Sequence, residues 1–119
     1  MYSIKVEANF SSAHNLRGYK GKCEELHGHN WKVEVTVSKD VLDKCGMVLD
    51  FKYLKKKLNG TLEKLDHKYL NNIPYFKKVN PTSENIAKYI YDSIRRQVPG
   101  VDSVTVWESD NSQGTYYGE

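Results

Sequence analysis

The sequence predicts an α+β fold, in which a four-stranded antiparallel sheet carries two helices on one face. Two long segments near the start alternate apolar and polar residues, which is typical of half-buried strands. Two central segments repeat apolar residues at three- and four-residue steps, the pattern of amphipathic helices. Two shorter alternating segments close the chain. We therefore expect the order strand, strand, helix, helix, strand, strand, in a single domain over residues 1–119.

The first two strands are the most regular part of the pattern. The first is predicted over residues 2–11, with apolar residues at every second position: Tyr2, Ile4, Val6, Ala8 and Phe10. The second begins near His27 and shows the same alternation at odd positions: Trp31, Val33, Val35 and Val37. Residues 15–22, which contain two glycines, form a loop between them. Two long strands joined in this way favour an antiparallel pair.

The helices and the closing strands follow in order. Asp50 is a good N-cap for a helix whose apolar face carries Phe51, Leu54, Leu58, Leu62 and Leu65. Asn71-Asn72-Ile73-Pro74 predicts a turn-rich break. Asn80-Pro81-Thr82-Ser83-Glu84 starts a second helix with the stripe Ile86, Ile90, Ile94 and Val98, which Pro99-Gly100 ends. Strands are then predicted over 104–108 and 115–117. Such a small open sheet leaves edge strands exposed, so we expect an oligomer.

Composition narrows the class of protein. The 119 residues carry a net charge of +3, which suits an anionic small molecule and is too small to indicate a nucleic-acid partner. No apolar run is long enough to cross a membrane, and no signal-peptide pattern opens the chain, so a cytoplasmic protein is expected. The two cysteines, Cys23 and Cys45, do not make a disulfide framework and are expected to be reduced.

The segment Cys23-Glu24-Glu25-Leu26-His27-Gly28-His29 concentrates groups that can bind a metal. His27 and His29 share the inward phase of the second strand, and His14 keeps that of the first. Three neutral imidazoles are a ligand set for catalytic zinc, which keeps a fourth position open. Cys23 could complete a closed structural site or stand beside the metal as a reactive thiolate, and we favour the thiolate.

Two acidic residues outside this segment, Asp66 and Glu108, are candidates for catalysis or ligand binding. Asp66 precedes His67 at the end of the first helix, where a carboxylate can fix an imidazole tautomer and raise its basicity. Glu108 shares a strand face with Val104 and Val106, where an unpaired carboxylate is costly. Glu108 should therefore have a partner, and a guanidine-like ligand edge would satisfy both of its oxygens.

The whole chain resembles the 6-pyruvoyl-tetrahydropterin synthase superfamily. Within it, the chain is most similar to the 6-carboxy-5,6,7,8-tetrahydropterin synthases of queuosine and 7-deazapurine biosynthesis. The matching stretches are Phe10-Ser11-Ser12-Ala13-His14, Cys23 to Asn30, Met47-Val48-Leu49-Asp50-Phe51, Leu65 to Asn71, Asn80 to Glu84, and Glu108-Ser109. The resemblance implies the tunnelling fold, in which subunits form barrels, and a homohexamer built from two trimers with sites at the subunit interfaces.

The resemblance also implies a role for each candidate residue. The zinc ligands would be His14, His27 and His29. Cys23 would be the catalytic thiolate, and His67, oriented by Asp66, the second acid/base group. Glu108 would anchor the pterin ring, with Thr82 and Ser83 closing the pocket from a neighbouring subunit.

The implied reaction converts 7,8-dihydroneopterin 3'-triphosphate to 6-carboxy-5,6,7,8-tetrahydropterin, with release of acetaldehyde and triphosphate. The gap of three residues between Cys23 and His27 favours this carboxy-forming branch. The alternatives are a 6-pyruvoyl-tetrahydropterin synthase, a dihydroneopterin side-chain lyase in which Glu24 replaces the cysteine, and a non-enzymatic zinc-stabilised binding module. The basic residues Arg17, Lys20 and Lys22 could neutralise the triphosphate.

Overall fold

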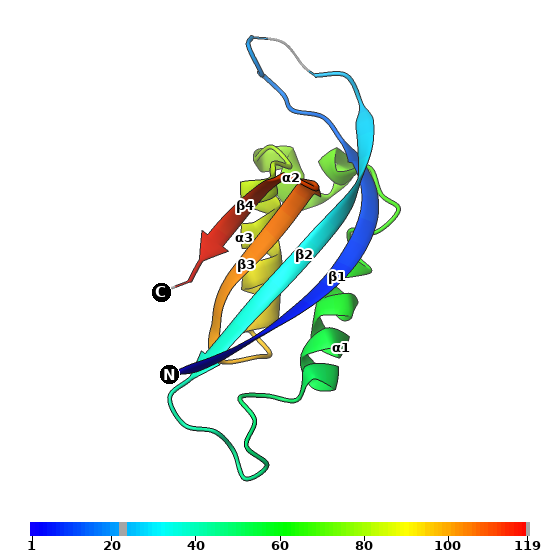
Figure 1. Ribbon diagram of the computed structural model, residues 1–119. Coiled ribbons are helices and arrows are strands. Elements are labelled where there is room, and N and C mark those ends of the chain that lie inside the picture. Colours follow the sequence, from blue (N-terminus) through cyan, green and yellow to red (C-terminus); the bar gives the residue numbers. More distant parts are fainter. Residues whose placement is uncertain (22–23, 119) are drawn as a thin grey trace.

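The fold is one antiparallel sheet with helices on one face, as the sequence predicts (Figure 1). The computed structural model describes residues 1–21 and 24–118. The strands lie in chain order across the sheet: β1 Tyr2–His14, β2 His27–Lys39, β3 Val101–Ser109 and β4 Ser112–Tyr117. The helices are α1 Phe51–Leu62, α2 Pro74–Lys78 and α3 Ser83–Arg95, with a 3₁₀ turn, η1, at Leu70–Asn72. Helix α1 packs on β1, and α3 packs on β3 and β4.

The core lies between the sheet and the two long helices. The inward residues of β2 are fully buried from Trp31 to Val37, and so are the leucines of α1 and the isoleucines of α3. Burying one such side chain contributes about 1.5–3 kcal/mol, so the alternation in the strands and the helical repeat account for most of the architecture.

Strand β1 extends beyond the predicted end at residue 11. Its last pairs with β2 are Ser12 with His29, Ala13 with Gly28, and His14 with His27. The extension has a partner on its other side as well, because the Ala13 N–H donates to the Lys68 carbonyl at 3.0 Å. Hydrogen bonds on both sides keep the strand extended as far as His14.

The helix boundaries also differ from the prediction. Helix α1 ends at Leu62, and Leu65 is buried in the turns that follow. Phe51, expected on the apolar face, is 53% exposed. The predicted break at residues 71–74 overlaps the turn η1 and leads into the short helix α2, whose first residue is Pro74. Proline suits the first position of a helix because its missing N–H would have no helical partner there.

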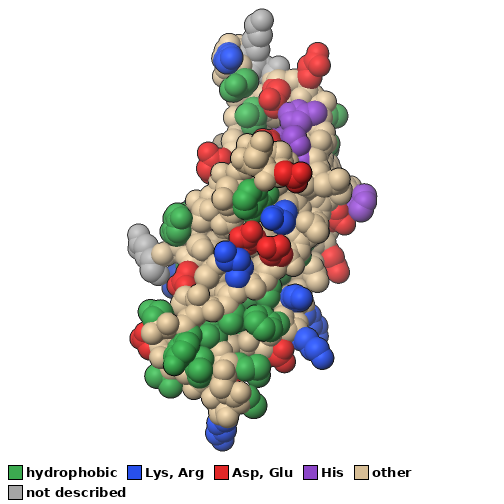
Figure 2. Space-filling model, in the orientation of Figure 1, with side chains coloured by type: hydrophobic (Ala, Val, Ile, Leu, Met, Phe, Trp, Pro, Cys, Tyr) green, Lys and Arg blue, Asp and Glu red, His purple; other side chains and the backbone are tan. Residues whose placement is uncertain are grey.

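Exposed hydrophobic side chains gather most densely towards one end of the molecule (Figure 2). Large hydrophobic side chains are exposed around the start of β1, the 40–50 connection and the start of α1: Met1, Tyr2, Val41, Met47, Phe51 and Tyr53. A group of histidine side chains reaches the surface towards the other end. No helix in the described part of the chain is long and apolar enough to cross a membrane.

Two glycines should respond in opposite ways to replacement by alanine. A Cβ at Gly114 would lie 3.1 Å from the backbone nitrogen of Glu84, at the start of α3. We expect Gly114→Ala to lower the free energy of unfolding by about 1–3 kcal/mol, because tight packing must be displaced. In α1, a Cβ at Gly60 would meet nothing within 4 Å. Gly60→Ala should therefore raise the free energy of unfolding by about 0.5–1 kcal/mol. Urea denaturation of both variants checks the pair, and equal effects would contradict it.

Candidate functional site

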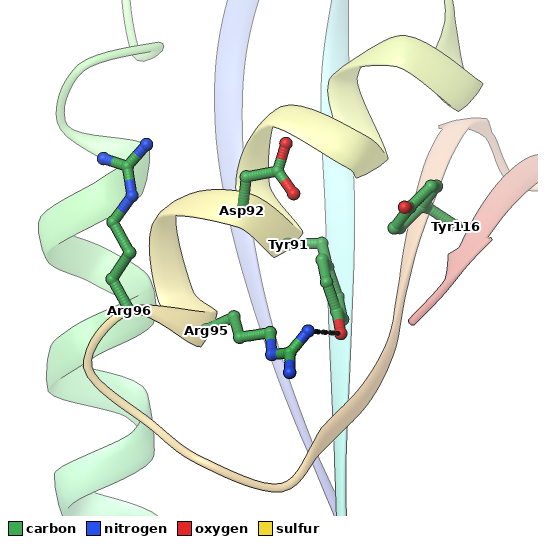
Figure 3. Close-up of a pocket in the computed structure, with 5 residues that line it drawn as sticks. All are labelled: Tyr91, Asp92, Arg95, Arg96 and Tyr116. Atoms are coloured by element: carbon green, nitrogen blue, oxygen red, sulfur yellow. Dashed lines mark hydrogen bonds between the residues drawn. The ribbon is translucent and has the colours of Figure 1, made fainter. Parts of the chain in front are cut away.

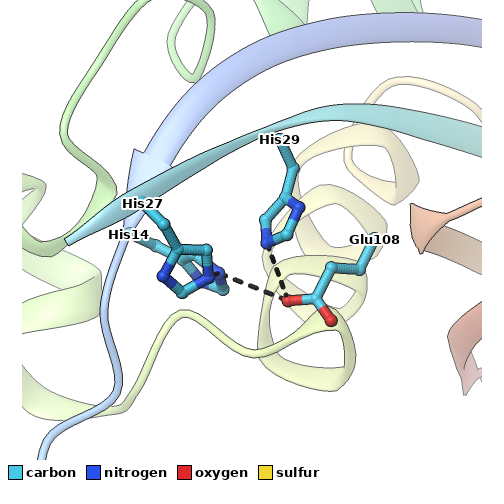
Figure 4. A group of neighbouring side chains, drawn as sticks. All are labelled: His14, His27, His29 and Glu108. Atoms are coloured by element: carbon cyan, nitrogen blue, oxygen red, sulfur yellow. Dashed lines mark hydrogen bonds and ion pairs between the residues drawn. The ribbon is translucent and has the colours of Figure 1, made fainter. Parts of the chain in front are cut away.

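Four side chains from three strands converge at one end of the sheet (Figure 4). His14 ends β1, His27 and His29 lie at the start of β2, and Glu108 lies near the end of β3. Their ligand atoms all lie within 4.8 Å of one another. The three histidines meet because His14 pairs with His27 across the strands, while His29 is two residues along on the same face.

Hydrogen bonds at the outer ring nitrogens fix two of the imidazoles. The Nδ1 atom of His14 lies 2.7 Å from the Pro81 carbonyl oxygen, and that of His27 lies 2.9 Å from the Glu25 carbonyl oxygen. A carbonyl oxygen only accepts, so each Nδ1 must carry the proton and donate it. In a neutral ring this leaves a lone pair on Nε2. Both lone pairs are therefore available inside the cluster.

The inner nitrogens are arranged as a metal requires. The Nε2 atoms of His14 and His27 are 3.0 Å apart, so two lone pairs face each other unless a cation lies between them. The buried Nε2 of His29 makes no hydrogen bond among the described residues, although Oε1 of Glu108 lies 3.2 Å away. Buried polar atoms are normally satisfied, and unmatched nitrogens at one point fit a metal ion. The residues present thus fit the predicted three-imidazole ligand set.

His14 is held in the uncharged form that a metal ligand needs. Its side chain is almost fully buried, and burial lowers the pKa of His14 below its ordinary value of 6.5. The neighbouring His27 and His29 lower this pKa further, while the Pro81 carbonyl and the Glu108 carboxylate oppose the shift. His14 therefore stays neutral near pH 7.

Glu108 lies directly beside the imidazoles. Its Oε1 atom is 3.3 Å from Nε2 of His14 and 3.2 Å from Nε2 of His29, and the side chain is 38% exposed. The sequence predicted a partner for this carboxylate but did not predict that histidines would provide it. The strand register explains the contact: Lys32 pairs with Trp107, so Glu108 lies next to Trp31 and diagonally across from His29.

Asp66 and His67 form a pair at the outer edge of β1, away from the histidine cluster. The Asp66 Oδ2 atom is 3.0 Å from Nδ1 of His67, and Oδ1 accepts the Ser11 N–H at 2.8 Å. The His67 backbone is left-handed, with φ of 54°, and its side chain is 83% exposed. The bond from the Ser11 N–H is the main reason that the pKa of Asp66 lies below its ordinary value. The Asp66 carboxylate therefore lies where it can orient the His67 imidazole.

Thr82 and Ser83 begin α3 close to the cluster. Thr82 is the N-cap, and its Oγ1 accepts the Asn85 N–H at 3.1 Å, while Ser83 packs against Gly114. The residue before them, Pro81, accepts the proton of His14. The start of α3 therefore supports a metal ligand, a contact that the sequence did not predict.

The segment before β2 is described in part. Cys23 lies outside the described residues, as does Lys22. Glu24 accepts the Leu16 N–H at 3.2 Å, and its Oε1 is 3.8 Å from Nδ1 of His27. One end of the Arg17 guanidinium is already engaged, because its Nη2 atom donates to the backbone carbonyls of Phe76 and Val79.

A separate hollow of about 530 Å³ lies between the C-terminal half of α3 and β4 (Figure 3). Its lining residues are Tyr91, Asp92, Arg95, Arg96 and Tyr116. Asp92 is paired with Lys88 at 2.8 Å, and Arg95 donates to the Tyr91 hydroxyl at 3.4 Å. None of the side chains of His14, His27, His29 and Glu108 lines this hollow. The histidine cluster is therefore the better candidate for chemistry.

Fold and site together define a class: a small antiparallel α+β protein that gathers three imidazoles and a carboxylate at one end of its sheet. The family model described as 6-pyruvoyl tetrahydropterin synthase matches residues 3–119. The chain belongs to this family. The predicted membership in this family of enzymes is confirmed.

Similar proteins carry several names. The chain is 39% identical to a 6-carboxy-5,6,7,8-tetrahydropterin synthase of Synechocystis, over 98% of this chain and 94% of the relative. It is 42% identical to the human 6-pyruvoyl tetrahydrobiopterin synthase, over 92% and 79%. It is 40% identical to a dihydroneopterin monophosphate aldolase of Pyrococcus furiosus, over 90% of each chain. These relatives share the family but differ in the reaction that their names state.

A solved structure supports the fold. The 6-pyruvoyl tetrahydropterin synthase of Caenorhabditis elegans superposes with a TM-score of 0.87 at 27% identity, over 99% of this chain and 96% of that one. The predicted arrangement of sheet and helices is therefore found in this family.

The Asp66 carboxylate should contribute stability that depends on pH. A folded pKa below the unfolded value means that ionised Asp66 stabilises the fold above about pH 4, and that this contribution is lost as the pH falls through the folded pKa. We expect Asp66→Asn to lower the melting temperature at pH 7 and to match the wild type more closely at pH 3. Circular dichroism across this range measures the difference. Asp40→Asn, at an exposed bend, is the control, and a deficit independent of pH would refute the assignment.

Proposed function

We propose that this chain is a zinc-dependent 6-carboxy-5,6,7,8-tetrahydropterin synthase of queuosine or 7-deazapurine biosynthesis. It would convert 7,8-dihydroneopterin 3'-triphosphate and release acetaldehyde and triphosphate. The convergence of three imidazole Nε2 atoms carries the proposal, because these atoms could hold the metal ion that this chemistry requires. The Synechocystis relative bears the same name, and the short gap from Cys23 to His27 favours this branch. We further propose one cytoplasmic domain spanning residues 1–119.

The proposed metal is zinc, held by His14, His27 and His29. When bound, it would act as a Lewis acid towards the oxygens of the substrate side chain. The hydrogen bonds to Pro81 and Glu25 keep the protons on the outer nitrogens of His14 and His27, so that Nε2 of each ring points inwards. Since these bonds lie within the chain, the ligand geometry is formed before metal or substrate arrives.

Proton transfer is assigned to Cys23 and His67. The Cys23 thiolate would remove a proton from carbon in the substrate side chain. Asp66 accepts from Nδ1 of His67, which leaves Nε2 of that ring free to accept or donate a second proton. His67 is highly exposed and outside the cluster of its own chain, which suits a site completed by a neighbouring subunit.

Glu108 is proposed to anchor the pterin ring. Its side chain is partly exposed, and a carboxylate can accept two parallel N–H bonds from an amino-pyrimidine edge. Thr82 and Ser83 are proposed to help close the pocket of a neighbouring subunit. The contact of Oε1 with two imidazoles gives Glu108 a second possible role as a metal ligand.

The proposed assembly is a homohexamer of two trimers, in which the sheets join into barrels. The outer strands β1 and β4 have backbone groups available for pairing with another copy. The exposed hydrophobic side chains from Met1 to Tyr53 would be covered by contacts between subunits. No nucleic acid or membrane is part of this proposal.

A second candidate function is cleavage of a dihydroneopterin side chain. It is favoured by Glu24, whose carboxylate lies 3.8 Å from a ring nitrogen of His27, and by the Pyrococcus relative named as an aldolase. We place it second because the Glu24 carboxylate is bonded to the Leu16 backbone. Pyruvoyl formation, the reaction named for the human relative, is the third candidate.

Product analysis distinguishes these functions. We expect the purified protein, incubated with zinc and dihydroneopterin triphosphate, to form 6-carboxytetrahydropterin and acetaldehyde. Mass spectrometry of the pterin and an assay for the aldehyde measure both products. Glycolaldehyde would favour the lyase, a pyruvoyl product would favour the third candidate, and bound zinc without turnover would favour a non-enzymatic module.

The same assay tests Cys23. Cys23→Ala should keep stoichiometric zinc and lose at least about a hundredfold in kcat, since proton transfer typically contributes 10²–10⁴-fold. Cys45→Ala, at an exposed cysteine, is the matched control and should leave turnover unchanged. Loss of zinc from Cys23→Ala would make the thiol a ligand instead of a base.

Glu108→Gln separates the two possible roles of that carboxylate. The variant keeps the shape of the side chain but replaces one acceptor oxygen by a donor. If Glu108 anchors the ring, zinc content stays the same and the Kd for a pterin rises by about tenfold or more, as expected for loss of a charge-assisted bond. Calorimetry with the pterin and metal analysis measure both values. Loss of zinc with unchanged pterin binding would show that Glu108 is a metal ligand.

A further inference from the structure

Residues 15–17, which follow β1, are held by the side chains of two asparagines on one side and by Glu24 on the other. Asn71 uses both ends of its amide: Oδ1 accepts the Asn15 N–H at 3.0 Å, and Nδ2 donates to the Asn15 carbonyl at 2.8 Å. Asn80 repeats the arrangement on Arg17, with both bonds at 2.9 Å. The two asparagine side chains thus form the backbone hydrogen bonds that an adjacent strand would otherwise form.

The other side of this segment is held by Glu24. Its carboxylate accepts the Leu16 N–H, and its own N–H donates to the Leu16 carbonyl at 2.8 Å. Backbone groups of alternate residues point in opposite directions in an extended chain. Asn15 and Arg17 therefore face the asparagines, and Leu16 faces Glu24.

Asn80 differs from Asn71 because its neighbour touches the histidine cluster. Pro81 is buried, and its carbonyl accepts the Nδ1 proton of His14 at 2.7 Å. The backbone of Asn80 is itself fixed, since its carbonyl accepts from the Thr82 N–H and from Nδ2 of Asn85, each at 2.9 Å. The position of the Pro81 carbonyl is therefore tied to the start of α3.

These contacts form a closed ring. His14 is joined to Arg17 through the backbone, and the Arg17 backbone forms two hydrogen bonds with the Asn80 side chain. Asn80 is covalently bonded to Pro81, whose carbonyl accepts the hydrogen bond from His14. The Arg17 guanidinium reinforces it by donating to the Val79 carbonyl at 2.9 Å. Turning the His14 imidazole would break its bond to the Pro81 carbonyl, and the contacts between Arg17 and Asn80 help to fix the position of that carbonyl.

We propose that Asn80 is a positioning residue of the metal site, which orients the His14 imidazole through Arg17 and Pro81. The inference rests on the metal site of the proposed function. Groups that hold a metal-bound histidine by its second nitrogen typically change metal affinity by 10–100-fold when they are lost. Asn80 acts one residue further from the metal, so we expect its removal to lower the metal affinity by about tenfold.

The test compares zinc binding by variants of the full chain. Asn80→Ala should raise the Kd for zinc by about tenfold, measured by competition with a chelator, and should change the visible absorption bands of the Co²⁺-loaded protein. Asn72→Ala, at an exposed asparagine beside Asn71, is the matched control. Ile94→Val, in the core at the far end of α3, controls for general loss of stability. Both controls should keep the wild-type Kd and spectrum.

The results separate the possible failures. A wild-type Kd and spectrum in Asn80→Ala would overturn the positioning role while leaving the metal site intact. An equal loss in Ile94→Val would also overturn it, because stability alone would then explain the effect. If the wild type binds no zinc, the metal site itself fails. Should Asn80→Ala not fold, Asn80→Ser takes its place, since its hydroxyl is too short to reach both groups of Arg17, and the same tenfold change decides.

Discussion

The pairing of His14 with His27 across β1 and β2 is the contact on which the site depends. A shift of one residue in this register would turn every side chain of one strand to the other face. The histidines of that strand would then leave the cluster, and its valines would leave the core. One hydrophobic pattern thus determines both the packing of the sheet and the position of the imidazoles. The positions of the imidazoles are well defined because the packing of the core fixes the register of the strands that carry them.

Much of this arrangement could be predicted from the sequence. The alternation from Tyr2 to Phe10 and from Trp31 to Val37 identified two strands and their buried faces. The same phase placed His14, His27 and His29 on one face, where the structure brings them together. The prediction worked here because a strand has a period of two, so that a few apolar residues determine the orientation of their polar neighbours.

What the sequence missed depends on contacts between distant segments. The end of β1 is stabilised by residues 66–69, more than 50 positions away, so the alternation alone stopped it too early. Asn71 and Asn80 read as ordinary turn and helix-start residues, yet their side chains hold the chain after His14. The sequence also did not indicate that Nη2 of Arg17 donates to the backbone carbonyls of Phe76 and Val79. Side-chain bonds to remote backbone leave no periodic signal.

The cluster also bears on the mechanical integrity of the sheet. Its side chains come from β1, β2 and β3 near the point where each strand begins or ends. Strand ends open more readily than strand centres, and a ligand that binds only the folded state stabilises it by about 4 kcal/mol at a thousand times its Kd. An ion bound at this point would link three strands. Loading the site would therefore make this end of the sheet harder to open, so that the stability of the strand ends would depend on the supply of metal.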